Sequence, residues 1–399
     1  MNVYFHTFGC KANQYDTELV RQAFAEQGAV VVDDPAAADL AVVNSCTVTQ
    51  ESEVKLRRLV RHVARASHAE TIVMGCAAAL DDGAIAALPS VRAVVANADP
   101  TMVLRAAGLP SPRAAPLRRH AKHRGLLKIQ DGCDEHCTFC ATTLARGANR
   151  SRSVADLVEE ARALAEHHPE IVLTGVHIGT YGVNPPESSL GELLERLIQA
   201  VPGVRFRLSS VEATEVDDRL ARLLIEAPRH VAPHLHAPLQ SGSNGILKRM
   251  GRHWYTAESY RARIEWLAER LPVFGLGADV IAGFPGETDD DHRASLTLLD
   301  ALPFSYLHVF PFSVRPDAPA ARLPNQQSPA VVKARARELR ELGEAKARAY
   351  RGRRVGQHAD GVVAGRSGGQ VDVLTEDYLS VYLPTDRWDG RPRFDLIVD

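Results

Sequence analysis

The sequence predicts an α/β protein with three parts: an N-terminal domain built on a doubly wound parallel sheet, a central partial barrel of six β/α units, and a small C-terminal β module. Apolar runs alternate with amphipathic stretches in the N-terminal part, and a second alternation of the same kind begins at Leu126. After Gly352 only short alternating segments remain. Because a chain of 399 residues exceeds the size of one ordinary core, we expect several domains.

The N-terminal domain is expected over residues 1–108. Its helices are predicted at 14–27, where Leu19 and Ala23 lie on one apolar face, and at 53–66. The predicted strands are 3–7, 29–32, 40–44, 71–75 and 93–96. Strands and helices that alternate in this way form a parallel sheet with helices on both faces.

A basic linker is expected over residues 109–125, because Pro110, Pro112 and Pro116 interrupt any regular element. Basic side chains gather in and just beyond it, and others follow the central cysteine motif. They are Arg113, Arg118, Arg119, Lys122, Arg124 and Lys128, then Arg146, Arg150 and Arg152. They could hold phosphate groups near the site, and the alternative is a solvated linker.

The central domain is expected over residues 126–350. Its predicted strands are 126–130, 171–174, 204–209, 231–236, 275–281 and 306–310. Six β/α units are fewer than a closed barrel needs, so we expect an open barrel with its site at the carboxyl ends of the strands. A long charged helix is predicted at 330–350. The last module, 351–399, is predicted to contain strands 361–363, 370–374 and 379–383.

The composition excludes some classes of protein. Charged residues make up 24% of the chain and the net charge is −2, so the whole chain has no electrostatic footprint for nucleic acid. No apolar run is long enough to span a bilayer, and the first residues lack the features of a secretory signal. We therefore expect a cytoplasmic protein whose six cysteines are thiols or metal ligands.

Cys133, Cys137 and Cys140 form a C-x3-C-x2-C run directly after the first strand of the barrel. Three thiolates so close in sequence can bind one face of a [4Fe-4S] cubane and leave one iron open. The open iron can bind the amino and carboxylate groups of S-adenosylmethionine, whose C–S bond breaks on one-electron reduction. This spacing, with Phe139 before the last cysteine, is typical of the radical-SAM superfamily. A zinc site with a distant histidine, or chance clustering, is the alternative.

Cys10, Cys46 and Cys76 each follow a predicted strand of the N-terminal sheet. Parallel strands place such positions together at the carboxyl edge of a sheet, so we expect the three thiols to converge. Gly9 and Gly75 precede two of them and allow a close backbone approach to a bulky ligand. A second cluster with an open iron is the hypothesis, and three unrelated buried cysteines are the alternative.

The chain resembles the methylthiotransferases, a radical-SAM family with a second cluster in an N-terminal domain. The resemblance runs over nearly the whole chain. In the first domain it is carried by 7–18 (TFGCKANQYDTE), 43–48 (VNSCTV) and 74–76 (MGC). In the second it is carried by 173–179 (LTGVHIG), 207–210 (RLSS), 238–243 (PLQSGS) and 279–288 (DVIAGFPGET).

The resemblance implies a pocket for S-adenosylmethionine at the strand ends. Thr174 and Gly175 would face the methionine part, and Ser210 and Gln240 the ribose. The backbone around Ile281 and Gly283 would face the adenine, with Phe139 beside the cluster. The alternative for a residue such as Gly283 is a simple turn glycine.

The resemblance also implies two [4Fe-4S] clusters and S-adenosylmethionine as radical source and methyl donor. The sequence motifs around Cys10 and at 208–212 are most like those of the tRNA branch that acts on N6-threonylcarbamoyladenosine beside the anticodon. The N6-isopentenyladenosine branch is the runner-up. A radical-SAM enzyme that modifies a protein side chain would also contain both clusters, as would a two-cluster electron carrier or iron sensor. We expect a monomer that binds a tRNA anticodon stem-loop, an electron donor and a sulfur source.

Two features depart from the family pattern. Residues 141–147 (ATTLARG) lack the proline and tyrosine that usually precede Ala-Arg-Gly, which puts the local substrate contacts in doubt. The C-terminal module stands where the family has an RNA-binding β barrel called TRAM, yet residues 350–399 contain seven arginines against eight acidic residues. Its aromatic side chains are chiefly Tyr378, Tyr382 and Trp388. RNA binding by this module alone is therefore weakly supported.

Overall fold

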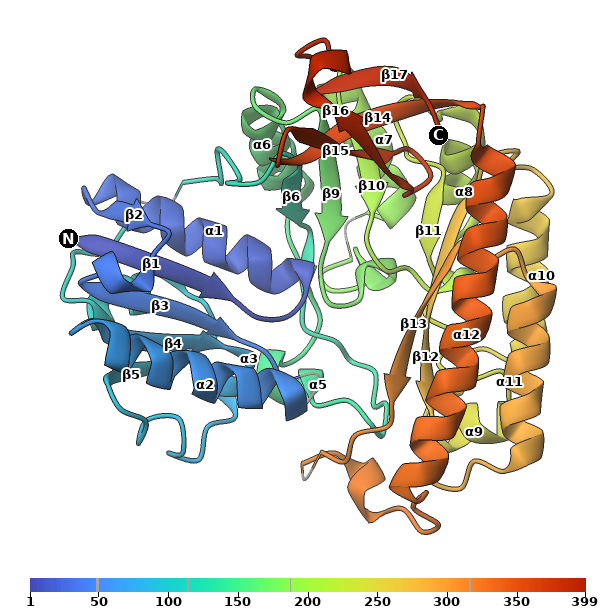
Figure 1. Ribbon diagram of the computed structural model, residues 1–399, viewed down its shortest axis with the longest axis horizontal. Coiled ribbons are helices and arrows are strands. Elements are labelled where there is room, and N and C mark those ends of the chain that lie inside the picture. The colour runs from blue at the N-terminus through green and yellow to red at the C-terminus, as the bar shows by residue number, and fades with distance from the viewer. Residues whose placement is uncertain (48–49, 113–114, 187, 316) are drawn as a thin grey trace.

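The computed structural model describes residues 1–47, 50–112, 115–186, 188–315 and 317–399. Its N-terminal sheet contains five parallel strands, and Figure 1 shows the arrangement of the elements. The strands are β1 (Asn2–Thr7), β2 (Val30–Val32), β3 (Leu40–Ser45), β4 (Glu70–Gly75) and β5 (Val91–Ala96). Their order is β2-β1-β3-β4-β5, so the chain reverses direction across the sheet between β1 and β3. Ligands of such sheets bind at the carboxyl ends of the strands near this reversal.

Helices cover both faces of this sheet, as a doubly wound fold requires. α1 (Lys11–Glu26) and α4 (Pro100–Ala106) pack on one face through Val20, Phe24 and Val103. α2 (Gln50–Ala66) and the short α3 (Cys76–Ala79) pack on the other through Leu56 and Ala77. The predicted N-terminal fold is therefore confirmed.

Six parallel strands form the central partial barrel. They are β6 (Gly125–Lys128), β9 (Glu170–Thr174), β10 (Arg205–Leu208), β11 (His234–His236), β12 (Gly275–Ala282) and β13 (Tyr306–Pro311). Bridges from Phe206 to Val231 and from Ser210 to His236 join the two halves of this order. The predicted strand at 231–236 is shorter than expected because Pro233 has no N–H for the ladder.

Helices pack on the outside of the barrel and leave its inner face to polar side chains. They are α6 (Val154–Ala165), α7 (Leu190–Ala200), α8 (Asp218–Glu226), α9 (Asn244–Arg249), α10 (Ala257–Ala268) and α11 (Asp289–Ala301). A short hairpin of β7 (Gln130–Asp131) and β8 (Arg150–Ser151) precedes them and flanks the five-residue helix α5 (Thr142–Arg146). The partial barrel of the sequence prediction is confirmed.

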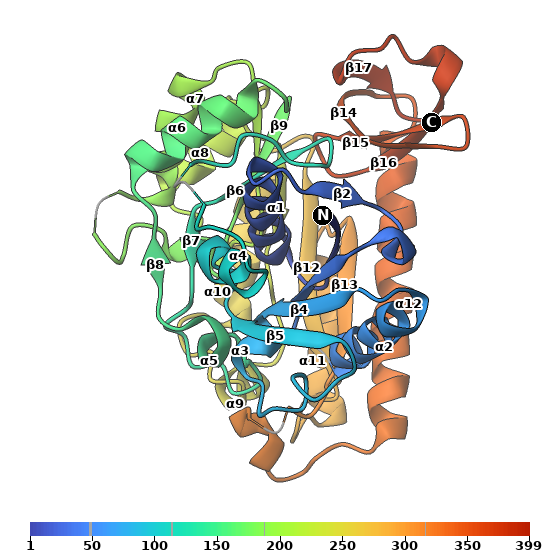
Figure 2. The ribbon, with the colours of Figure 1, turned by 90° about the vertical axis from the view of Figure 1, so that its left-hand side faces the viewer.

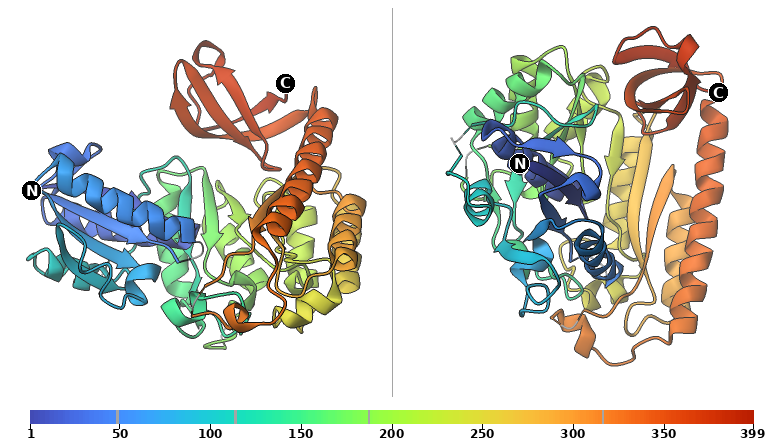
Figure 3. Two further views of the ribbon diagram at one scale, coloured as in Figure 1. Left: turned by 60° about the horizontal axis from the view of Figure 1, so that its bottom comes forward. Right: turned by 60° about the vertical axis from the view of Figure 1, so that its left-hand side comes forward.

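The long helix α12 (Pro329–Arg354) packs along β13 and ends at the C-terminal module (Figures 2 and 3). It is longer than predicted because Arg354 pairs with Asp377 at 2.8 Å, which extends the helix onto the module. The module is an antiparallel sheet of β14 (His358–Ser367), β15 (Gln370–Thr375), β16 (Ser380–Pro384) and β17 (Arg393–Ile397). The sequence prediction missed β17.

The C-terminal module docks on the end of the barrel where its strands begin. Arg205 donates to the carbonyl of Asp360 at 2.6 Å, and Arg207 donates to the carbonyls of Thr375 and Glu376 at 2.9 and 3.0 Å. Both arginines are fully buried and pair with the buried carboxylate of Glu170. The carboxyl ends of the barrel strands therefore remain available for the site.

Candidate active site

The N-terminal thiols lie at the carboxyl edge of the sheet. Cys10 caps α1 after β1, Cys46 follows β3, and Cys76 is the first residue of α3 after β4. These three strands are neighbours in the sheet. A Cβ on Gly9 would lie 2.9 Å from Sγ of Cys46, so the loops that carry Cys10 and Cys46 touch. Burial raises the pKa of the Cys76 thiol to about 11, and the Cys10 and Cys46 thiols act in the same direction.

Asn13 fixes these loops to one another. Its side-chain amide donates to the carbonyls of Phe8 and Ser45, both at 2.9 Å. Its Oδ1 lies 3.7 Å from Sγ of Cys76. Sequence reasoning gave Asn13 no role beyond its place in the first motif, and its position three residues after Cys10 is the signal that could have found it.

Cys133, Cys137 and Cys140 lie in an irregular, half-buried loop between β7 and α5. The loop is held by contacts with the segment after α9, where Thr138 donates to the carbonyl of Met250 at 2.8 Å. Backbone N–H groups point at two of the sulfurs: Glu135 donates to Cys133 at 3.4 Å and Thr142 to Cys140 at 3.3 Å. Such donors lower the negative charge that a bound cluster would carry on its sulfurs.

Charged side chains complete the site in the barrel, and sequence reasoning missed them. Arg252 donates to Sγ of Cys137 at 3.4 Å and forms an ion pair with Glu212. His177 lies 3.7 Å from Sγ of Cys133 and 2.6 Å from the carboxylate of Glu215. Burial alone would lower the pKa of His177, but these partners raise it to about 10. The loop is therefore bordered by cationic groups, although burial still raises the pKa of the Cys137 thiol to about 12.

The thiol spacing suits a cluster better than a single ion. Two groups of described histidine, cysteine and acidic side chains have their ligand atoms within 4.8 Å of one another, and neither contains a cysteine. A tetrahedral zinc ion would hold its sulfur ligands about 3.8 Å apart. A [4Fe-4S] cluster is wider, and its usual ligands are thiolates. Both triplets therefore have the donor atoms that such clusters require.

Arg146 connects the two cysteine sites. It ends α5, which begins two residues after Cys140, and its Nε donates to Sγ of Cys76 at 3.2 Å. The same guanidinium pairs with Asp16 and Asp131 at 2.9 Å. Since a helix of this length rises about 7.5 Å, Arg146 brings Cys76 close to the loop that carries Cys140. The sequence-based interpretation of Arg146 as a phosphate contact is contradicted by its burial and pairing.

The predicted pocket residues lie at the carboxyl ends of successive strands. Thr174 ends β9 and is buried, with Gly175 directly after it. Ser210 is exposed and bridges to His236, while Gln240 bridges to Val280. Ile281 is in β12. Gly283 has φ +74°, and a Cβ added to it would lie 2.6 Å from Cγ2 of Val332. Phe139 meets the Phe284 ring edge-on at 6.5 Å. Their contacts with S-adenosylmethionine stay a prediction.

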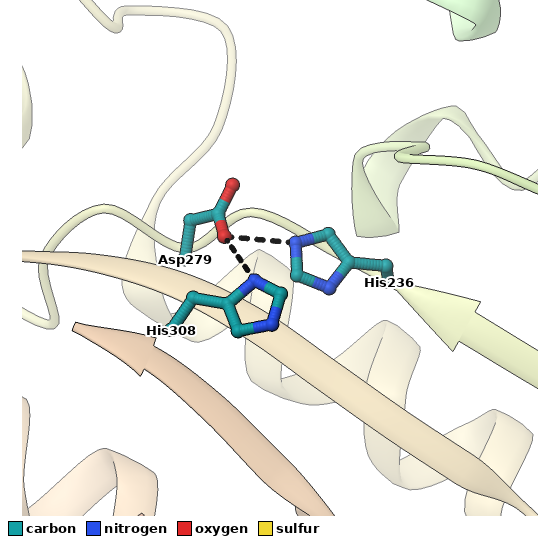
Figure 4. A group of neighbouring side chains, drawn as sticks. All are labelled: His236, Asp279 and His308. Atoms are coloured by element: carbon teal, nitrogen blue, oxygen red, sulfur yellow. Dashed lines mark hydrogen bonds and ion pairs between the residues drawn. The ribbon is translucent and has the colours of Figure 1, made fainter. Parts of the chain in front are cut away.

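A polar wall lines the barrel interior next to these strand ends. Figure 4 shows Asp279 between the rings of His236 and His308, with contacts of 2.9 and 3.2 Å. Tyr306 contacts His236 at 3.0 Å and His234 at 2.9 Å. The three groups of Figure 4 could also bind a metal ion, but their mutual hydrogen bonds already account for their positions. Sequence reasoning missed this wall because its members come from three separate strands.

The basic residues divide into paired and exposed groups. Arg124 pairs with Glu170, Lys128 with Asp16 and Asp131, and Arg152 with Glu160. These three cations therefore neutralise carboxylates inside the protein. Arg118, Arg119, Lys122 and Arg150 are exposed, while Arg113 lies outside the described residues, as does Val48 of the cysteine motif. The exposed group remains available for phosphate.

The aromatic side chains of the C-terminal module are mostly engaged. Tyr378 stacks on His234 with ring centroids 4.4 Å apart, and Arg366 covers Trp388 at 3.8 Å. Tyr382 is exposed. Tyr378 and Trp388 are therefore not free to stack on bases.

No helix of the described residues is long and apolar enough to cross a membrane.

Comparison with known proteins identifies two families in the chain. The model described as the radical SAM superfamily matches residues 127–299, and the uncharacterized protein family UPF0004 matches residues 2–96. A radical S-adenosylmethionine methyltransferase, TsrM from Kitasatospora setae, solved with cobalamin and a [4Fe-4S] cluster, matches with a TM-score of 0.60. The alignment covers 80% of this chain and 77% of that one at 15% identity, so it supports the fold alone.

Curated relatives match over most of their length. The threonylcarbamoyladenosine tRNA methylthiotransferase MtaB of Bacillus subtilis (strain 168) is 37% identical over 369 residues, covering 87% of this chain and 81% of the relative. The enzyme of the same name from Aquifex aeolicus (strain VF5) is 33% identical over 408 residues, covering 96% of each. Enzymes of this kind use S-adenosylmethionine and two [4Fe-4S] clusters, as the two thiol triplets predict. The chain therefore belongs to the radical-SAM tRNA methylthiotransferases.

Proposed function

We propose that the chain converts N6-threonylcarbamoyladenosine beside the tRNA anticodon into its 2-methylthio derivative. The observation that carries the proposal is the contact of Arg146 with Sγ of Cys76, because Arg146 follows Cys140 by one short helix and so joins the two cysteine regions. The printed names of the relatives support the choice of nucleoside. Sulfur insertion at a C–H position needs both a radical source and a sulfur carrier close to the same carbon.

We assign Cys133, Cys137 and Cys140 to the cluster that binds S-adenosylmethionine, because the predicted pocket lies at the strand ends beside them. Cys10, Cys46 and Cys76 would hold the cluster that delivers sulfur. When bound, the first cluster supplies the electron that cleaves S-adenosylmethionine, and the second supplies the sulfur atom. The protein side chains then have to hold the nucleoside and exclude water.

The chain's own residues support the two cysteine sites and provide a surface for the RNA backbone. Asn13 and Arg146 fix the loops around Cys76, and Arg252 supports Cys137. Of the linker cations, Arg118, Arg119 and Lys122 are exposed on the surface and would contact phosphate groups of the anticodon stem. The buried cations of the interior are paired and would not contribute to that binding.

Comparative analysis of tRNA nucleosides tests the proposed substrate. Liquid chromatography with mass spectrometry of tRNA from a deletion strain should show loss of 2-methylthio-N6-threonylcarbamoyladenosine and its return on complementation. Persistence of that nucleoside, with loss of the methylthio-isopentenyl nucleoside, would assign the runner-up substrate. If neither nucleoside changes, and no other enzyme covers the loss, tRNA is not the substrate.

Replacement of the exposed linker cations tests the RNA contact. The triple variant Arg118→Gln, Arg119→Gln and Lys122→Gln should bind tRNA more weakly with a flatter salt dependence, because fewer counterions are released. Cleavage of S-adenosylmethionine without tRNA should not change. The matched triple Lys333→Gln, Arg337→Gln and Arg340→Gln removes three exposed charges from α12 and should leave the salt dependence unchanged. Equal effects of the two triples would contradict a linker footprint.

A further inference from the structure

Lys11 is a cation without a partner inside the interface of the three parts of the chain. It is the first residue of α1, directly after Cys10, and it is partly buried. Within the described ranges, no hydrogen bond or ion pair joins its ammonium to another residue. Burial lowers the pKa of its amine, and its electrostatic neighbours are the cations Arg124 and Arg207 together with the Tyr378 hydroxyl and the Cys10 thiol. A lysine in such surroundings is normally neutralised by an anion.

The surrounding carboxylates are already engaged. Glu170, the buried carboxylate of this region, is shared by Arg124 at 3.4 Å, Arg205 at 2.7 Å and Arg207 at 2.9 Å. Nη2 of Arg205 is buried and has no hydrogen-bond partner among the described residues. The nearby wall of Figure 4 uses its Asp279 carboxylate for His236 and His308. Among the described residues, no carboxylate is therefore left to pair with Lys11.

The position of Lys11 restricts which anion can reach it. Cys10 would hold the cluster that delivers sulfur, so the adenine carbon that accepts sulfur must lie close to Lys11. That carbon, C2, is separated from the carbon that bears N6 by one ring nitrogen. A group attached to N6 therefore extends within reach of the long, flexible lysine stem. Threonylcarbamoyl ends in a free carboxylate, whereas an isopentenyl group is uncharged.

We propose that Lys11 binds the carboxylate of the threonylcarbamoyl group and so selects this nucleoside over an uncharged N6 substituent. The inference rests on the proposed function, since it assigns a recognition residue to that substrate. A tRNA phosphate shares the anionic chemistry, but the base and its substituent are the parts of an extruded nucleotide that enter a site most deeply. The ammonium would gain a charge-assisted hydrogen bond in a partly desolvated site.

Binding of defined anticodon stem-loops to the reconstituted enzyme tests the assignment. Three RNAs of one sequence are compared, carrying threonylcarbamoyladenosine, its carboxamide analogue, or plain adenosine at the target position. The wild type should prefer the carboxylate over the carboxamide by about tenfold or more, as one charge-assisted hydrogen bond allows. Lys11→Met should lose this preference, and Lys11→Arg should keep most of it. Lys333→Met, an exposed lysine of α12, should bind as the wild type does.

Three outcomes would overturn the inference. Equal weakening of all three RNAs in Lys11→Met would assign Lys11 to a phosphate. Loss of the second cluster's iron in Lys11→Met, but not in Lys11→Arg, would assign Lys11 to the cluster. An unchanged carboxylate preference would show that another group binds this carboxylate. The proposed function fails separately, when the wild type forms no methylthio product from the threonylcarbamoyl RNA.

Discussion

The two cysteine sites reach similar donor sets by different structural routes. Cys10, Cys46 and Cys76 come from three strand ends of a regular sheet, so the sheet itself sets their separation. Cys133, Cys137 and Cys140 come from one irregular loop, whose shape depends on contacts with residues 249–252. The N-terminal site is built by topology and the site in the barrel by local sequence. Each also has one arginine that donates to a sulfur, Arg146 at Cys76 and Arg252 at Cys137.

Removing either triplet should separate the two roles and gives the largest expected effect. The variant with alanine at Cys133, Cys137 and Cys140 should lose about half of the bound iron and all cleavage of S-adenosylmethionine. The variant with alanine at Cys10, Cys46 and Cys76 should still form 5′-deoxyadenosine but no methylthio nucleoside. Iron analysis and product chromatography of anaerobically reconstituted protein measure both. Stoichiometric zinc in the wild type, or loss of all cleavage in a folded second variant that retains the first cluster, would contradict this division.

Arg146→Met tests the link between the sites. The variant leaves Asp16 and Asp131 without one of their cationic partners in a largely buried network. Breaking a buried pair in this way costs about 3–5 kcal/mol of unfolding free energy, and denaturant unfolding measures it. Product formation should also fall at saturating tRNA, because Cys76 loses its donor.

The matched control for Arg146 is Arg150→Met. Arg150 is exposed and, among the residues that the structure describes, donates only to backbone carbonyls, so its loss should change stability by less than about 0.5 kcal/mol. A similar loss in both variants would mean that the buried network does not stabilise the interface between the domains.

The same contrast explains what the sequence could and could not predict. Strand periodicity located Cys10, Cys46 and Cys76 at one sheet edge, because parallel strands have a fixed direction. Charge counting failed for Arg146, Arg124 and Lys128, because pairing partners such as Asp16 lie far away along the chain. The polar wall at Asp279 escaped prediction for the same reason. Long-range pairing of charged groups leaves no local pattern in a sequence.

Gly75→Ala tests how closely the sheet sets the N-terminal site of Cys10, Cys46 and Cys76. Gly75 has φ +93°, and an added Cβ would lie 2.1 Å from Oδ1 of Asn44 and 2.7 Å from the carbonyl of Ser45. The substitution adds a steric clash to backbone strain, so we expect a loss of about 3 kcal/mol or more and depleted iron at the second cluster. Gly83→Ala provides the control, because Gly83 has φ +101° with open space around it. It should cost only about 1–2 kcal/mol, the strain alone, and equal losses would mean that packing at Gly75 contributes nothing.

The smallest effect is expected at Arg252, which supports Cys137 without forming part of the donor set. Arg252 brings a positive charge and a hydrogen bond to the sulfur at 3.4 Å, and both favour the reduced, more negative form of a bound cluster. Arg252→Met should therefore lower the reduction potential of the radical cluster and leave that of the second cluster unchanged. A potentiometric titration followed by electron paramagnetic resonance resolves the two.

Lys248→Met is the matched control, since Lys248 is an exposed cation of α9 with no contact to a sulfur among the described residues. It should shift neither potential. If Arg252→Met also leaves both potentials unchanged while iron content is intact, the arginine acts only by holding Glu212, to which it is paired. In that case product formation should fall in Arg252→Met and return in Arg252→Lys, because lysine can still pair with Glu212 although it lacks the planar guanidinium. A potential that falls in Arg252→Met and recovers in Arg252→Lys would instead show that positive charge near the loop, rather than the regular sheet of the N-terminal domain, sets how easily the first cluster is reduced.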